Sequence, residues 1–297
     1  GLPLTLATSN QAASVRAMPL AGRTALVTGG ARGIGRAAAR KLAAAGADVI
    51  VNYYNSHDEA EALCAELRAM GRRALGVQGS VADVAVVWAR TDEGVMGFLV
   101  PKGTKGFTTQ DIHKKLSLRA SITSELLLDE VRLPDSARLP EVASLKGPLS
   151  CLNEARYGIV WGAIGAARVC CEAALSYSKE RTQCDKPIGG FQIQQAKLAK
   201  MAVEVNRGTL LALHLGRMKD EGALRPEHVS MGKLANVDAA LDVCRTARQM
   251  LGANGITLEY PVIRHMNNLE SVVTYEGTAD VHALVLGETL TGIGGFR

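Results

Sequence analysis

The C-terminal half of the sequence contains four stretches with the length and pattern of α-helices, and this feature constrains the fold more than any other. We expect these helices at Cys151–Arg181, Phe191–Asp220, Pro226–Leu251 and Thr278–Leu290. Pro226 suits a first helical position, Thr278 suits an N-cap, and Gly252 follows the third helix as a stop signal. Three long helices and a shorter one predict an antiparallel bundle.

The first part of the chain has a different pattern, in which short apolar strands alternate with helices. Three strands are expected at Thr24–Thr28, Asp48–Asn52 and Arg73–Val77. Helices are expected between them at Arg36–Ala45 and His57–Met70. Strands joined by helices in this way form a parallel sheet, so the sequence predicts one βαβαβ half of a doubly wound, Rossmann-like fold.

The segment between these two regions continues neither pattern. Val86–Arg90 and Val95–Val100 flank a turn and predict an antiparallel hairpin, and further extended segments are expected at Ser117–Thr123 and Leu126–Leu133. The expected fold class is therefore mixed, with an N-terminal α/β Rossmann-like fragment, a short antiparallel β segment and a C-terminal all-α helical bundle. The expected domains are a leader (1–18), the Rossmann-like fragment (19–85), a partial β-domain (86–147) and the bundle (148–297).

The first seventeen residues contain neither a basic start nor a long apolar core, so they do not predict a secretory signal. Met18 is a natural starting residue, and the segment before it is interpreted as leader. We therefore expect a cytoplasmic protein, or a protein of the mitochondrial matrix if the source is eukaryotic.

The composition argues against several classes of function. Hydrophobic residues make up 47% of the chain and charged residues 21%, as in ordinary globular proteins. The net charge of +5 is spread without a basic stripe, so nucleic acid is not an expected partner. No stretch of about eighteen apolar residues is free of charge, so no membrane span is expected.

The metal-binding residue types are not spaced as metal ligands. The six cysteines show no paired spacing and no flanking histidines, so we expect reduced thiols and no bound metal. His265 and His282 flank a candidate catalytic glutamate, Glu276, and are candidate supporting residues, but neither has a second ligand at suitable spacing.

A glycine-rich turn lies between the first expected strand and helix. Gly29, Gly33 and Gly35 have the spacing of dinucleotide-binding turns, in which backbone amides at the helix start approach a pyrophosphate. The strand before the turn and the helix after it meet the structural condition for such a site. The turn is therefore a candidate nucleotide site, and its alternative is a turn that only folds the chain.

Residues 20–84 resemble the N-terminal portion of the short-chain dehydrogenase/reductase family, whose glycine signature matches Thr28–Gly35. This resemblance implies a dinucleotide cofactor, and Arg32 favours NADP. The family's catalytic tyrosine precedes a lysine by four residues, whereas Tyr177 here is followed at that spacing by Arg181. An NAD(P)-dependent reductase and a folded fragment without catalysis both remain open.

Glu276 lies in the segment Val272–Thr278, directly before the last expected helix. A carboxylate in apolar surroundings is suited to remove a weakly acidic proton from carbon. The alternative is that Glu276 only offers its charge to the N-terminus of the helix. The spacing alone does not decide between a catalytic base and a helix-terminal charge.

Residues 86–297 resemble the acyl-CoA dehydrogenase family, and its glutaryl-CoA branch in particular. The matching segments are Val87–Arg90, Leu116–Ser121, Cys151–Gly158, Val262–Met266 and Thr274–Thr278. The resemblance implies that Glu276 is the base that takes the α-proton of an acyl-CoA while a hydride leaves the β-carbon for FAD. In the glutaryl branch, the enoyl product then loses its terminal carboxylate as carbon dioxide and becomes crotonyl-CoA.

The same resemblance implies binding roles for further residues. Those that match FAD contacts of the family are Arg181, Gln192, Gln249, Gly252, Thr278 and Phe296. Those that match acyl-CoA contacts are Asn153, Arg156 and Gly277. The segment that begins at Gln249 matches one that reaches the FAD of a neighbouring subunit, so a homo-oligomer, and specifically a tetramer, is implied.

The sequence also departs from this family. Cys184 and Asp185 replace an aromatic–glycine pair after Arg181, and the family's N-terminal helical domain has no counterpart, so an inactive protein is one expectation. Three functions therefore remain: an FAD-dependent acyl-CoA dehydrogenase, which the motifs favour, an NAD(P)-dependent short-chain reductase, and a non-catalytic helical module that mediates oligomerisation.

Overall fold

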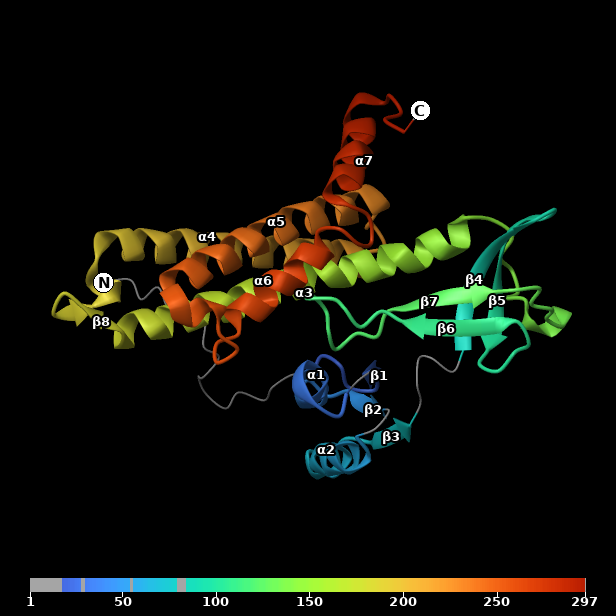
Figure 1. Ribbon diagram of the computed structural model, residues 1–297, viewed down its shortest axis with the longest axis horizontal. Helices are drawn as coiled ribbons and strands as arrows, with labels where there is room; N and C mark the ends of the chain where they lie inside the picture. The colour runs from blue at the N-terminus through green and yellow to red at the C-terminus, as the bar shows by residue number, and fades with distance from the viewer. Residues whose placement is uncertain (1–17, 28–29, 54–55, 79–83, 297) are drawn as a thin grey trace. The chain divides into compact units, whose positions relative to one another are not determined.

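The computed structural model describes residues 18–27, 30–53, 56–78 and 84–296. Contacts divide the chain into two compact units. The first contains the chain up to Val86 together with Leu99–Thr104, and the second contains Val87–Phe98 and Lys105–Arg297. Each unit has its own hydrophobic core, and the mixed fold class predicted from the sequence is confirmed (Figure 1).

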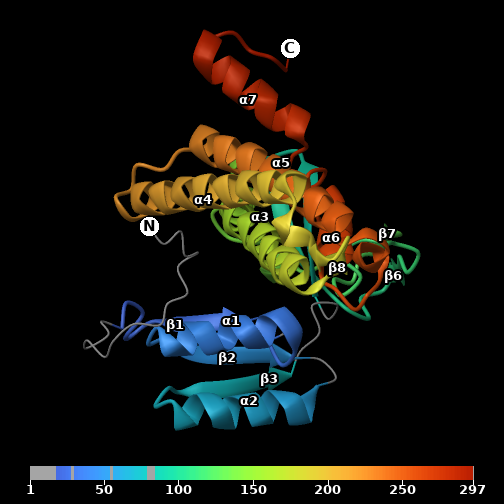
Figure 2. The same cartoon turned by 90° about the vertical axis from the view of Figure 1, so that its left-hand side faces the viewer.

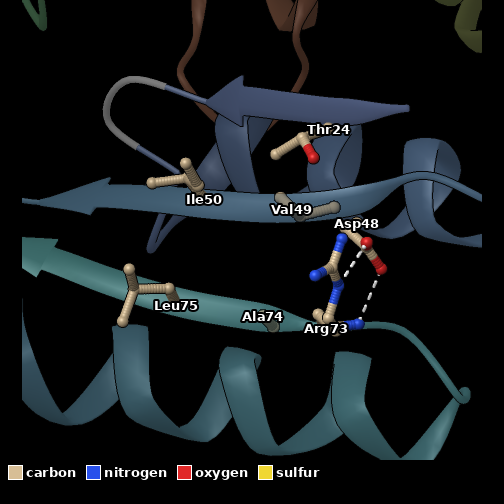
Figure 3. A pocket seen from close by; sticks show the side chains of 7 residues that line it. All are labelled: Thr24, Asp48, Val49, Ile50, Arg73, Ala74 and Leu75. Carbon is tan, nitrogen blue, oxygen red and sulfur yellow. Dashed lines mark hydrogen bonds and ion pairs between the residues drawn. The ribbon is translucent and has the colours of Figure 1, made fainter. Parts of the chain in front are cut away.

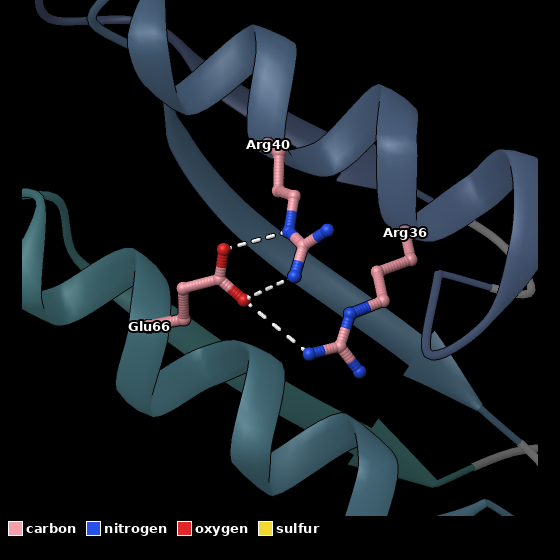
Figure 4. Close-up of polar contacts among 3 residues, drawn as sticks. All are labelled: Arg36, Arg40 and Glu66. Carbon is pink, nitrogen blue, oxygen red and sulfur yellow. Dashed lines mark hydrogen bonds and ion pairs between the residues drawn. The ribbon is translucent and has the colours of Figure 1, made fainter.

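The first unit contains a three-stranded parallel sheet with β2 in the centre (Figure 2). Its elements are β1 (Thr24–Val27), α1 (Gly33–Ala44), β2 (Asp48–Tyr53), α2 (His57–Ala69) and β3 (Ala74–Gln78). Alternate residues of β2, such as Val49 and Val51, are buried in a core to which both helices contribute. Arg36 and Arg40 of α1 both pair with Glu66 of α2 (Figure 4). The predicted βαβαβ order is confirmed.

The other face of this sheet carries aliphatic side chains in register. Leu26 pairs with Ile50, and Ile50 pairs with Leu75, so these three form one row across the strands. Leu26 is 64% exposed and Leu75 is 57% exposed. A hollow of about 230 Å³ is lined by Ile50 and Leu75 of this row but not by Leu26. Arg73 and Asp48 also line it, and Arg73 Nε contacts Asp48 Oδ2 at 2.7 Å (Figure 3).

The β segment consists of two separate pairs of strands. The first is the predicted hairpin, formed by β4 (Val84–Thr91) and β5 (Gly94–Pro101). The second pairs β6 (Phe107–Asp111) with β7 (Ser124–Leu128) in antiparallel register, and β6 was not predicted from the sequence.

The predicted extended segment Ser117–Thr123 is wrong, because this segment is irregular. Lys115 Nζ donates to the Leu118 carbonyl at 3.1 Å and to Thr123 Oγ1 at 2.7 Å, which folds the segment back on itself. Leu118 has a positive φ of 48°, and its amide donates to Asn268 Oδ1 at 2.8 Å. A strand conformation is incompatible with these contacts.

The second unit is dominated by helices. They are α3 (Lys146–Glu180), α4 (Gln192–Asp220), α5 (Pro226–Met250), α6 (Val262–Val272) and α7 (Ala279–Thr291). Two short strands, β8 (Thr182–Gln183) and β9 (Lys186–Pro187), lie between α3 and α4. The four expected helices are present, and α3 begins five residues earlier than predicted. Helix α6 was not predicted from the sequence, although Val262, Met266 and Leu269 recur at helical spacing; with only 11 residues it gives a short signal.

Helix α5 is the centre of the bundle and packs against α3, α4, α6 and α7, while α7 extends away from the other helices (Figure 1). The helices approach closely because small residues line their contacts: a side chain at Gly208 would collide with Ile164. Buried Asn236 Nδ2 donates at 3.0 Å to the carbonyls of Val160 and Gly208, which links α5 to both neighbours.

Helix α3 has the length and apolar composition that a membrane span requires. Core helices of bundles meet the same requirement. Ala163, Ala167 and Cys170 of α3 are buried in the bundle core, together with residues of α4 and α5. The apolar side of α3 is therefore accounted for by packing between helices.

Candidate active site

Glu276 lies in the short loop between α6 and α7, and the backbone there has an unusual conformation. Glu276 has φ of 57° and Gly277 has φ of 88°, so two consecutive residues are left-handed. This conformation is costly for a residue with a side chain and is common at functional sites. Thr278 is the predicted N-cap of α7, and its Oγ1 accepts from the Val281 amide at 3.2 Å.

Two cationic side chains hold three consecutive carbonyl groups of this loop. Arg156 of α3 donates from Nε to the Glu276 carbonyl at 2.7 Å and from Nη1 to Asn153 Oδ1 at 3.2 Å. Lys233 of α5 donates to the carbonyls of Tyr275 and Gly277, the latter at 2.5 Å. Asn153, Arg156 and Gly277, which were predicted from the family resemblance, are thus brought together around Glu276.

Lys233 was not identified from the sequence, although it is only 1% exposed. Burial, and to a smaller extent the charge of Arg156, lowers the pKa of Lys233 to about 8, while Glu276 acts in the opposite direction. A signal was present in the sequence, because Lys233 lies four residues after Val229 and four before Val237. Both valines are buried, so the lysine occupies the apolar side of α5.

The Glu276 carboxylate itself is half-buried. Its Oε2 atom is buried and has no hydrogen-bond partner among the described residues. Burial, together with the neighbouring Glu276 charge, raises the pKa of Tyr275. An uncommitted carboxylate oxygen that is shielded from solvent is available to accept a proton from a bound molecule.

His282 of α7 packs directly beneath the loop and is 1% exposed. Its Nδ1 lies 3.1 Å from Ser230 Oγ, and its Nε2 has no partner among the described residues. A Cβ atom at position 277 would come within 3.0 Å of His282 Nε2, so only glycine fits this position without a shift of the ring. Burial, followed by the charges of Lys233 and Arg156, lowers the pKa of His282 to about 4.

The lowered pKa of His282 predicts that acid destabilises the helical unit. Between pH 6.5 and 4 the unfolded chain protonates this histidine while the folded chain does not, so stability falls as the pH is lowered. We expect the loss in unfolding free energy across this interval to be smaller in His282→Gln by about 3 kcal/mol. Urea unfolding followed by helical circular dichroism measures it, with exposed His214→Gln as the control. Equal pH slopes in His282→Gln and the unchanged chain would contradict the prediction.

A second cluster of predicted residues lines a groove where α3 ends and η3 (Gly252–Ile256) follows α5. The groove has a volume of about 320 Å³, and its lining includes Arg181, Gln194, Gln249 and Gly252. Arg181 forms no ion pair within the described part of the chain, and the buried Gln194 Oε1 has no hydrogen-bond partner there. A phosphate and an amide or hydroxyl donor would satisfy these two groups.

Three predicted FAD residues lie outside this groove, and one of them is Thr278, the N-cap of α7. Gln192 is the exposed first residue of α4, and Gln194 from the same turn lines the groove instead. Phe296 is 56% exposed and follows the end of α7. The spacing along a helix explains the difference at Gln192, because residues two positions apart point to different sides.

The groove and the Glu276 loop are far apart within one chain. Arg156 contacts the loop and Arg181 lines the groove, and the helix α3 places these residues about 37 Å apart along its axis. A single dinucleotide cannot bridge this distance. Two copies of the chain are needed if both clusters are to contact the same molecule.

The candidate nucleotide turn of the first unit is described only in part. Gly29 lies outside the described residues, whereas Gly33 begins α1 with φ of 53° and Gly35 follows in the first turn. Arg32 Nε donates to Ser56 Oγ at 2.7 Å and lies 3.4 Å from Glu59 Oε1.

No cluster of three or more potential metal ligands occurs within residues 18–27, 30–53, 56–78 and 84–296. All six cysteines are free thiols. Cys170 and Cys244 lie 3.4 Å apart in the bundle core, and this contact, followed by burial, raises the pKa of Cys244.

Two family models match different parts of the chain. Residues 146–291 match the family model described as acyl-CoA dehydrogenase, C-terminal domain, and residues 23–94 match the model described as short chain dehydrogenase. A glutaryl-CoA dehydrogenase from Desulfococcus multivorans is 34% identical over 220 residues, which are 71% of this chain and 56% of that protein.

Two solved structures that the chain resembles are also glutaryl-CoA dehydrogenases. A glutaryl-CoA dehydrogenase from Mycobacterium smegmatis matches with a TM-score of 0.72 and 66% identity, over 74% of this chain and 57% of that one. A glutaryl-CoA dehydrogenase from the same organism, in complex with FADH2, matches with a TM-score of 0.71 and 58% identity, over 72% and 56%. The chain thus spans a little more than half the length of the relatives it matches.

Proposed function

Since the helical region of this chain is an acyl-CoA dehydrogenase C-terminal domain, we propose that the protein takes part in the FAD-dependent dehydrogenation of an acyl-CoA, with glutaryl-CoA as the substrate. The observation that carries the proposal is the buried, unpartnered Oε2 atom of Glu276 in a loop held by Arg156 and Lys233. A glutamate that only served the helix N-terminus would not need two cationic side chains to hold the backbone around it.

In this proposal, Glu276 accepts the α-proton of the thioester. Bound FAD would supply the acceptor for the hydride that leaves the β-carbon. With glutaryl-CoA, the enoyl product then releases its terminal carboxylate as carbon dioxide, and the carbon that carried it takes up a proton, which yields crotonyl-CoA. Arg156 and Lys233 hold the loop, and Asn153 fixes the guanidinium of Arg156.

The groove fits the diphosphate end of FAD. Arg181 offers an unpaired charge, Gln249 offers an amide, and the orphaned Gln194 oxygen needs a donor. Thr278, next to Glu276, would contact the same cofactor from a second chain. The proposal therefore includes a homo-oligomer, and we favour a tetramer. Exposed apolar residues of α4, among them Val203 (54% exposed) and Leu210 (67% exposed), support association of copies.

FAD binding tests the proposal directly. The purified chain, titrated with FAD and washed, is expected to retain a yellow chromophore in proportion to its oligomeric fraction. Arg181→Ala should weaken this binding because it removes the charge of the groove, whereas Arg207→Ala, a control for an exposed arginine of α4, should not. A chain that remains colourless at saturating FAD would contradict the proposal.

For the first unit we propose NADP binding, supported by the short-chain dehydrogenase match and by Arg32 beside the first turn of α1. The same titration with NADP in place of FAD measures it. An NAD(P)-dependent reductase and a non-catalytic oligomerisation module are the alternative functions. We place the protein in the cytoplasm, or in the mitochondrial matrix for a eukaryotic source.

A further inference from the structure

Lys233, like Arg156, binds the loop that carries Glu276. Its ammonium donates to the carbonyls of Tyr275 and Gly277, the residues that directly precede and follow Glu276. We propose that Lys233 is a positioning residue that sets the direction of the Glu276 carboxylate. This inference rests on the proposed role of Glu276 as the base.

The geometry of the loop explains why such a contact is needed. Glu276 and Gly277 are both left-handed, with φ of 57° and 88°. A glutamate without restraint favours the right-handed or extended regions, which would turn its side chain elsewhere. Lys233 holds the Tyr275 carbonyl, which belongs to the peptide plane directly before the Cα of Glu276, and Arg156 holds the plane directly after it through the Glu276 carbonyl. Lys233 also holds the next plane, through the Gly277 carbonyl, and so restrains the loop on both sides of this pair.

The residue type is also informative. Burying an ammonium group costs free energy, and an apolar side chain of the same length would fill the space more cheaply. Lys233 is nevertheless 1% exposed and forms no ion pair among the residues that the structure describes. The ammonium group of lysine has three N–H donors, so a single lysine can donate to the Tyr275 and Gly277 carbonyls at once. Its burial is explained by this contact and not by packing.

Lys233 and Arg156 hold the loop from different helices. Arg156 projects from α3 and binds the middle carbonyl, whereas Lys233 projects from α5 and binds the outer two. Helices α3 and α5 pack closely in the bundle core. The position of Glu276 is therefore fixed relative to the packed core of the bundle.

The test compares Lys233→Met with the unchanged chain, each loaded with FAD. We expect Lys233→Met to lower kcat on the order of 10²-fold with KM changed less than twofold, because a displaced base affects proton removal more than substrate binding. Hydrogen exchange of the amides at 275–278 should become faster. Lys219→Met is the matched control, since the half-buried Lys219 pairs with Glu154 and lies 5.1 Å from the centre of the Tyr157 ring. It should change neither kcat nor the exchange of the loop amides.

Lys233→Gln keeps N–H donors in its side-chain amide and is the variant to measure if Lys233→Met does not fold. We expect it to lower kcat less, by about tenfold. The inference is overturned if the folded variants retain kcat within twofold, or if loop exchange is unchanged. A failure of the proposed function looks different: Glu276→Gln would then turn over like the unchanged chain, while the exchange measurement would still report whether Lys233 holds the loop.

Discussion

The Glu276→Gln variant is expected to reduce an electron-accepting dye with glutaryl-CoA about 10²–10⁴-fold more slowly than the unchanged chain, with its FAD content preserved. The amide has nearly the volume of the carboxylate but cannot accept a proton. Because Oε2 has no hydrogen-bond partner among the described residues, the substitution breaks no contact of that atom. The loss of rate would therefore report the chemistry of the base and not a change of fold.

Steady-state dye reduction measures the rate, and the visible spectrum of the bound flavin measures the FAD content. The control is Glu288→Gln, which removes an exposed carboxylate of the neighbouring helix α7 and should leave the rate unchanged. Turnover of Glu276→Gln at the rate of the unchanged chain would eliminate Glu276 as the base.

Two inactive variants are expected to restore activity when they assemble together. One carries Glu276→Gln, and the other carries Arg181→Ala with Gln249→Ala. The two clusters lie about 37 Å apart along α3, so a complete FAD site needs the loop of one copy and the groove of another. Random assembly of equal amounts pairs an intact loop with an intact groove in about one quarter of the sites.

Co-expression with two different affinity tags isolates the mixed oligomers, and dye reduction is then compared with that of each variant alone. The expected result is about a quarter of the unchanged activity, against near-zero activity for the separate variants. Mixed oligomers as inactive as their parents would show that the two clusters do not share a cofactor between copies.

Much of the secondary structure could be predicted because its signals are local. The strands and helices of the first unit follow from the alternation of apolar residues with glycine and polar breaks. The segment Ser117–Thr123 could not be predicted, since its conformation depends on contacts with Asn268 and Ser271, about 150 residues later in the chain. Helix α6 was missed although its apolar residues recur at helical spacing, because an apolar pattern over only 11 residues does not by itself distinguish a helix from a strand.

The residues of the candidate site could also be predicted only in part. Family resemblance identified Glu276 as the catalytic base, and Asn153 and Arg156 as residues that bind the substrate. It did not indicate that Arg156 holds the backbone of Glu276 across 120 residues of sequence. Lys233 was missed because a lysine is normally expected to be exposed. Its partners are the backbone carbonyls of Tyr275 and Gly277, and because every residue has such a carbonyl, no sequence pattern marks them.

The sequence by itself determined the parallel strands, the helices other than α6, and the identity of the acid before α7, because periodicity and short motifs act over a few neighbouring residues. Only the tertiary structure decided that Arg156 and Lys233 converge on three successive carbonyls, and that the groove at Arg181 lies far from Glu276. Such distances depend on how helices pack, and packing is set by contacts between residues far apart in the chain.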